Sequence, residues 1–118
     1  MSDLINFQGN NIRQVEHDGE TYFSVIDVVA VLSESLNPRR YWSDLKKKER
    51  QLYEIVVQLK LPAADGKKYK TDCANREGIF RIIQSIPSPN AEPFKRWLAQ
   101  IGEQRLQEIE DPAKAMDR

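Results

Sequence analysis

The sequence predicts a single α+β domain in which short antiparallel β-hairpins pack against four to five helices. Three observations support this fold class. The 118 residues suffice for one hydrophobic core, with 40% hydrophobic and 31% charged residues. Short β-prone runs flank Asp–Gly pairs, which favour tight turns. Segments with apolar residues at helical spacing follow these runs.

An Asp–Gly turn predicts a β-hairpin near the N-terminus. The β-prone residues 11–16 and 21–25 flank Asp18 and Gly19. Glycine adopts positive φ without strain, which closes the tight turn between two such strands. His17, the only histidine, adjoins this turn, so we expect it to be exposed and structural, not catalytic.

Two helices are expected after this hairpin. The first runs from about residue 25 to residue 34 and is capped by Ser24, with Asp27 in its first turn, where an acid favours the helix dipole. Pro38 suits the first turn of the second helix, which continues to Lys48. Its apolar side chains share one side: Tyr41, Trp42 and Leu45.

The middle of the chain predicts a further helix or irregular segment and then a second hairpin. Apolar residues at i, i+3, i+4 and i+7 place the helix or irregular segment at residues 49–59. An exposed loop follows at residues 62–68, where Asp65 and Gly66 provide turn chemistry. Residues 69–73 form a short strand, and strands on both sides of the loop would make the hairpin.

Two more helices are expected in the C-terminal third. The first covers residues 76–83 and ends before Pro87, because proline cannot continue a helix. We expect four of its side chains to be largely buried: Ile79, Phe80, Ile82 and Ile83. The last helix opens at Asn90 or Ala91. Its apolar face carries Phe94, Trp97, Leu98, Ile101, Leu106 and Ile109.

The end of the chain sets the expected domain boundary. Pro112 interrupts the last helix, and the charged segment after it carries no stopping signal. We therefore expect residues 1–110 to form the domain. Residues 111–118 would begin a linker or C-terminal region of a longer protein.

Composition argues against several classes of protein. The N-terminus lacks a secretory signal, and no apolar stretch approaches the roughly 20 residues that span a bilayer. A single cysteine, Cys73, excludes an internal disulfide and is expected to be a small buried residue. These features suit the cytoplasm.

The usual catalytic motifs are also missing from the sequence. It has no glycine-rich phosphate loop, no HExxH motif and no paired CxxC, so we expect no enzyme, no metal and no cofactor. Asp27 and Asp44 are the one pair of acids considered as catalytic candidates. A helix cap and a salt-bridge partner explain them more simply.

A formal net charge of zero hides a basic middle third. Residues 1–35 have a charge balance of −5, residues 36–70 of +6 and residues 71–118 of −1. Lysine and arginine neutralise phosphates, and here aromatic residues are interleaved with them. We therefore expect a nucleic-acid-binding surface at residues 39–70, with ten candidates: Arg39, Arg40, Lys46, Lys47, Lys48, Arg50, Lys67, Lys68, Tyr69 and Lys70.

Other interpretations of this region remain open. The charge alone also fits a solvated face beside a loop. Trp42 is either a core anchor, which its spacing with Tyr41 and Leu45 favours, or a base-stacking residue. For Tyr69, the pattern fits a core role and a base-stacking role equally well.

Two blocks of sequence together resemble a known family. Residues 21–32 fit the pattern W/Y-F-x-x-x-D-V-x-x-x-L, and residues 75–83 fit E-G-x-x-x-L/I-I. Residues 88–98, with Phe94 and Trp97, fit the segment that leads into a final helix. In order and spacing, roughly residues 5–105 resemble the N-terminal domain of the BRO family, which occurs in baculovirus repeated-ORF proteins and prophage antirepressors.

The resemblance implies an α+β DNA-binding domain, usually the front part of a longer regulator. The signature positions fall on expected fold-forming sites and do not identify a DNA-contacting surface: Phe23, Asp27, Gly78, Phe94 and Trp97. Residues 33–38 depart from the family pattern, so the basic segment after them cannot be matched residue by residue.

We therefore expect the DNA-binding domain of a phage or prophage antirepressor-like transcriptional regulator. The alternative is a protein-interaction module that binds a repressor or host factor without contacting DNA. A nuclease that uses acidic residues and a divalent ion is a third hypothesis. The sequence is compatible with a homodimer but fixes no symmetry.

Overall fold

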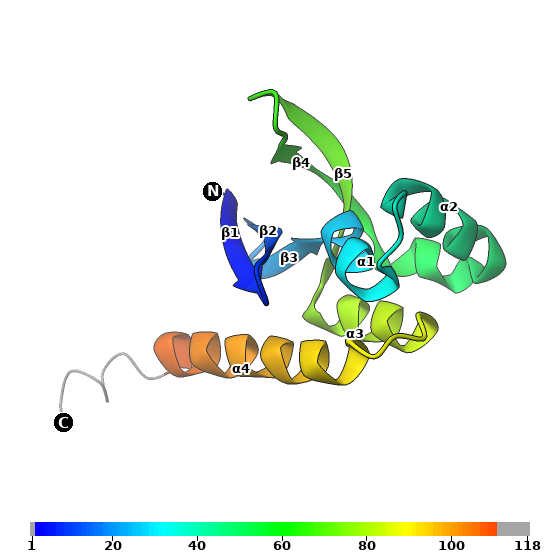
Figure 1. Ribbon diagram of the computed structural model, residues 1–118. Helices are drawn as coiled ribbons and strands as arrows, with labels where there is room; N and C mark the ends of the chain where they lie inside the picture. Colours follow the sequence, from blue (N-terminus) through cyan, green and yellow to red (C-terminus); the bar gives the residue numbers. More distant parts are fainter. Residues whose placement is uncertain (1, 111–118) are drawn as a thin grey trace, which may run out of the picture.

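The computed structural model describes residues 2–110 and has a five-stranded antiparallel sheet with helices packed against it (Figure 1). The elements follow in the order β1 (Ser2–Phe7), β2 (Asn10–His17), β3 (Glu20–Ser24), α1 (Val25–Ser33), α2 (Pro38–Lys48), the 3-10 helix η1 (Arg50–Ile55), β4 (Val57–Pro62), β5 (Lys68–Asn75), α3 (Arg76–Ser85) and α4 (Ala91–Glu110). The strand order is β1-β2-β3-β5-β4. The predicted α+β fold class is confirmed.

The predicted N-terminal hairpin is formed by β2 and β3. His17 pairs with Glu20, and the two turn residues Asp18 and Gly19 have φ values of 51° and 79°. Positive φ at both positions matches the twist of the flanking strands. β1, which the sequence analysis did not predict, adds to the free side of β2 through a similar two-residue turn.

Helix α1 begins where its cap was predicted. The side chain of Ser24 accepts a hydrogen bond from the backbone N–H of Asp27 at 3.4 Å. Buried valines and a leucine on α1 join the core cluster together with sheet residues such as Ile12 and Phe23. Helix α2 also begins as predicted, with Pro38 in its first turn and the side chain of Asn37 as its cap.

The prediction of a helix or irregular segment at residues 49–59 is wrong for the last part of this range. The 3-10 helix η1 ends at Ile55, and the chain is extended from Val57 onward in β4. Apolar residues at 57, 59 and 61 alternate with Gln58 and Lys60, which is the period of a strand. This local alternation, together with pairing to β5, determines the conformation.

The predicted second hairpin is confirmed and is longer than expected. β4 pairs with β5 from Val57 opposite Cys73 to Pro62 opposite Lys68. The loop between them is closed by a hydrogen bond from the N–H of Ala63 to the carbonyl of Lys67 at 2.8 Å. In Figure 1 this β4–β5 hairpin extends at the top of the view, beyond the helices.

Helix α3 packs closely on the sheet at Gly78. A Cβ atom at this glycine would lie 3.0 Å from the Cβ of Ala74 and 3.2 Å from the carbonyl oxygen of Ile55. Any larger residue would therefore push α3 away from β5. Of the four α3 side chains predicted to be buried, the three isoleucines are buried and Phe80 is partly buried.

Helix α4 begins at Ala91, as predicted, and its first half closes the core. Phe94 and Leu98 are buried, and the ring of Phe94 lies 4.9 Å from that of Phe7 and 5.0 Å from that of Trp97. Trp97 and Ile101 are partly buried. The predicted roles of the Leu106 and Ile109 side chains, of Pro112 and of residues 111–118 lie outside the described part of the chain.

Candidate nucleic-acid interface

A cleft of about 540 Å³ lies between α2 and the β4–β5 hairpin. From α2 it is lined by Arg39, Trp42, Ser43 and Lys46. These positions follow i, i+3, i+4, i+7 spacing and so share one face of the helix. From the hairpin it is lined by Gln58, Ala63, Tyr69, Lys70, Thr71 and Asp72, with Arg13 and Ile26 at its side. We call this site the α2–hairpin cleft.

Three lysines lie on the face of the hairpin that is turned towards α2. Lys60 is directly opposite Lys70, and Lys68 is opposite Pro62. Opposite residues share a face of the sheet, and Asp72, two positions from Lys70, contacts α2 from that face. All three lysines are exposed, and no described acidic side chain forms a salt bridge with them.

The pair of Lys60 and Lys70 carries an energetic cost for the hairpin. Like charges directly opposite each other destabilise a pair of strands. A bound polyanion would remove this repulsion because each phosphate attracts both ammonium groups. The arrangement therefore favours a phosphate-bearing partner over a neutral one.

The carboxylate of Asp72 joins α2 to the hairpin. Its Oδ2 accepts hydrogen bonds from Trp42 Nε1 and from Lys46 Nζ, both at 2.8 Å, and its Oδ1 accepts one from Gln58 Nε2 at 3.3 Å. Burial raises the pKa of Asp72, but the hydrogen bonds from Lys46, Trp42 and Gln58 together lower this pKa below its ordinary value. The carboxylate is therefore ionised at neutral pH.

Trp42 is a core anchor, as its favoured interpretation predicted. Its side chain is 2% exposed and belongs to the main core cluster, with only its N–H directed at Asp72. Tyr69, in contrast, is half-exposed, and its hydroxyl donates a hydrogen bond to the carboxylate of Asp65 in the loop. This hydrogen bond raises the pKa of Tyr69.

A second carboxylate, that of Asp27, orients an arginine that contacts the loop end of the hairpin. Asp27 accepts hydrogen bonds from the backbone N–H and the Nε of Arg13, each at 2.9 Å, and from its Nη2 at 3.1 Å. Arg13 Nη1 donates to the carbonyl of Pro62 at 2.9 Å, so that one guanidinium connects β2, α1 and the end of β4. The hydrogen bond to Asp27 raises the pKa of Arg13.

Three further sequence predictions concern residues that were expected to be structural. Cys73 is fully buried, as predicted, and burial raises the pKa of its thiol to about 11. Asp44 lies 3.9 Å from Arg40 in an exposed pair, which confirms its role as a salt-bridge partner. The side chain of His17 is 40% exposed and lies against the ring of Tyr22.

The structure separates the ten predicted binding residues into three groups. The cleft brings together Arg39, Lys46, Tyr69 and Lys70. The hairpin tip and its flank carry Lys67 and Lys68, which are exposed. Outside the cleft lining are Arg40, Lys47, Lys48 and Arg50, which are also exposed.

Lys60 was missing from the predicted set, although it is the direct partner of Lys70. The predicted helix or irregular segment at residues 49–59 ended just before it, so its position on the hairpin was not recognised. The alternation of polar and apolar residues from Val57 to Leu61 is the signal that would have placed Lys60 on a strand.

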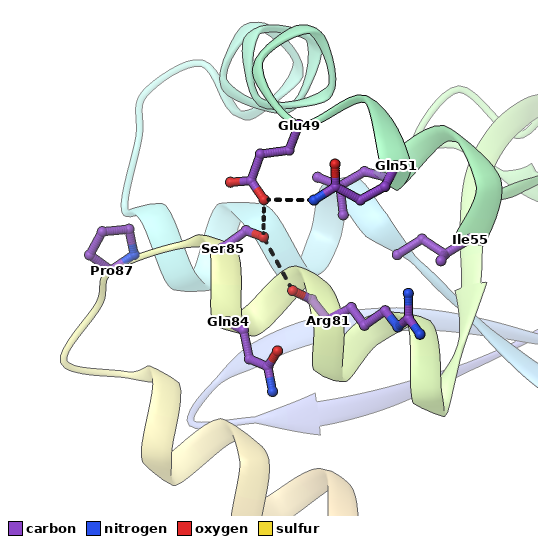
Figure 2. A pocket seen from close by; sticks show the side chains of 8 residues that line it. Glu49, Gln51, Ile55, Arg81, Gln84, Ser85 and Pro87 are labelled. Atoms are coloured by element: carbon purple, nitrogen blue, oxygen red, sulfur yellow. Dashed lines mark hydrogen bonds between the residues drawn. The ribbon is translucent and has the colours of Figure 1, made fainter.

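A second hollow of about 670 Å³ lies between η1 and α3 and has a different character (Figure 2). Figure 2 shows the hydroxyl of Ser85 between the carboxylate of Glu49, at 2.9 Å, and the backbone carbonyl of Arg81, at 3.3 Å. Among the residues that the structure describes, the charged ones in its lining are Glu49 and Arg81. Because these charges balance, the hollow lacks the positive excess of the α2–hairpin cleft.

Residues 2–110 contain no group of three or more His, Cys, Asp or Glu residues arranged to hold a metal ion. Within the same residues, none of the helices combines the length and the apolar character needed to cross a bilayer.

The fold and the cleft define a small α+β domain with a localised cationic surface. The chain belongs to the BRO family: residues 11–104 match the description "BRO family, N-terminal domain". This confirms the resemblance found in the sequence. The family is associated with phage and prophage regulators. No curated protein and no solved structure matched the chain.

Proposed function

We propose that this domain binds duplex DNA through the α2–hairpin cleft, as the DNA-binding domain of a phage or prophage antirepressor-like transcriptional regulator in the cytoplasm. The observation that carries the proposal is the set of lysines on one face of the hairpin that no described acidic side chain pairs, with Lys60 directly opposite Lys70. This arrangement costs stability unless a polyanion neutralises it. Membership of the BRO family supports the same conclusion.

The two sides of the cleft have different roles in this proposal. On the hairpin, Lys70 in the cleft lining contacts phosphates together with Lys60 and Lys68, which lie beside the cleft on the same face. These contacts give affinity and orientation without sequence choice. Helix α2 is about as wide as the major groove, since a helix with side chains measures about 10–12 Å across. Arg39 and Arg40, exposed in its first turns, then lie where arginine can bond guanine edges.

The remaining predicted residues have secondary roles. Lys67 at the hairpin tip reaches a neighbouring phosphate. Lys47, Lys48 and Arg50 lie outside the cleft lining and add a general attraction that salt screens. Among the predicted residues, Lys46 is the one whose charge is balanced by a buried partner.

Replacing Lys60, Lys68 and Lys70 together by glutamine tests the proposal. We expect the affinity for a short labelled duplex to fall at least about tenfold at low salt, because the DNA releases about three fewer counterions when it binds the variant. For the same reason the slope of log K against log salt concentration should shrink by about two to three. Fluorescence anisotropy titrations at several salt concentrations measure both quantities.

A matched control makes the same change in net charge at another place. Replacing Lys47, Lys48 and Arg50 by glutamine should weaken binding by less than about threefold. Equal losses in the two triple variants would contradict a binding site in the cleft. If the wild-type domain bound no duplex at low salt, the alternative would be favoured, namely a protein-interaction module that binds a repressor or host factor.

A further inference from the structure

Lys46 differs from the other lysines at the proposed interface. Its Nζ lies 2.8 Å from Asp72 Oδ2 and 5.4 Å from the ring centres of both Trp42 and Tyr53. The side chain of Lys46 is 20% exposed and that of Asp72 is 11% exposed. The charge of this lysine is thus balanced inside the protein, whereas no described acidic side chain pairs with Lys70 on the same cleft.

Asp72 also determines where the hairpin stands relative to α2. Among residues 2–110, every hydrogen bond between α2 and the β4–β5 hairpin ends on this carboxylate. Gln58 completes its environment from β4. One acidic side chain therefore both fixes the cleft geometry and places a negative charge in a cleft lined with cations.

We infer that Asp72 is a positioning and charge-setting residue of the DNA interface: it holds Lys46 away from phosphates and keeps the hairpin at a fixed distance from α2. This inference rests on the proposed DNA binding. The carboxylate repels any phosphate that approaches the cleft floor, so phosphates stay on the rim with Lys60, Lys68 and Lys70. Asp72 thereby limits the part of the affinity that is independent of DNA sequence.

Replacing Asp72 by asparagine removes this charge and keeps the shape of the side chain. The amide oxygen of the asparagine still accepts from Trp42, and Gln58 can turn its carboxamide to accept from the new N–H₂ group. Lys46 becomes an unpaired cation facing the cleft. We expect Asp72→Asn to bind duplex DNA about three- to tenfold more tightly and to steepen the salt slope by about one.

The double variant Lys46→Met with Asp72→Asn separates this inference from a direct phosphate contact by Lys46. If Asp72 neutralises Lys46, removing both charges leaves the affinity within about twofold of the wild type and the salt slope unchanged. A salt slope shallower by about one in the double variant would show that Lys46 already contacts a phosphate, and would overturn the inference. An Asp72→Asn variant with unchanged affinity and slope would overturn it as well.

Nuclear magnetic resonance of the lysine ammonium groups tests in the wild-type protein whether Lys46 contacts phosphates. This experiment does not depend on the correct folding of a variant. On addition of duplex DNA, we expect the Lys70 ammonium signal to shift and the Lys46 signal to stay in place. A Lys46 signal that moved as far as that of Lys70 would contradict the inference. Failure of the proposed function would look different, because no lysine signal would move and wild-type DNA binding would be absent.

Discussion

Replacing Asp27 by alanine should lower the free energy of unfolding by about 2–4 kcal/mol, because it leaves a largely buried guanidinium without its partner. The side chains of Arg13 and Asp27 are only 21% and 17% exposed, so solvent screens their interaction weakly. Three hydrogen bonds between the two residues are lost together. Without Asp27, the Arg13 guanidinium is no longer held in the position from which it donates to the carbonyl of Pro62.

Urea unfolding of the Asp27→Ala variant measures this change, and Asp44→Ala is the matched control. Asp44 faces Arg40 at 3.9 Å in an exposed pair, so its removal should alter the unfolding free energy by less than about 0.5 kcal/mol. A loss below about 1 kcal/mol for Asp27→Ala would contradict the role given to this network. Faster amide exchange in the β4–β5 hairpin is expected in the same variant, since Arg13 no longer holds Pro62.

Replacing Phe94 by alanine should cost about 3–5 kcal/mol, because it opens a cavity where α4 meets the sheet. Phe94 is fully buried, and its ring packs edge-on against Phe7 and beside Trp97. Truncation removes both aromatic contacts along with the buried area. The expected result is a domain in which α4 no longer holds β1 in place.

Thermal and urea unfolding of Phe94→Ala test this expectation, with truncation of an exposed apolar residue as the control. Leu36 is fully exposed between α1 and α2, so Leu36→Ala should change the unfolding free energy by less than about 0.5 kcal/mol. If the two variants unfolded at similar urea concentrations, the packing of α4 on the sheet would not contribute as the structure indicates.

The parts of the fold that were predictable carry strong local signals. Asp18 and Gly19 define the first hairpin, Ser24 caps α1, and Pro38 opens α2, each through contacts within a few residues. The signature positions of the family also have structural explanations. Asp27 orients Arg13, and Gly78 permits the close approach of α3. Residues of this kind report on the fold and not on the ligand.

The parts that were missed depend on contacts distant in the sequence. β3 pairs with β5, more than forty-five residues later, and no spacing rule predicts that partner. Lys60 became recognisable as a site residue only when β4 was placed opposite β5. In the same way, the sequence marks Lys46 as one of several basic residues, and only the position of Asp72 shows that its charge is balanced.

The proposal that the α2–hairpin cleft binds DNA is tested most directly by the salt dependence of wild-type binding. With Lys60, Lys67, Lys68 and Lys70 at phosphates, anisotropy titrations with a short duplex should give a slope of log K against log salt concentration of about −3 to −4. Lys46, balanced by Asp72, should add nothing to this slope. A slope near zero, or no binding at low salt, would contradict the account.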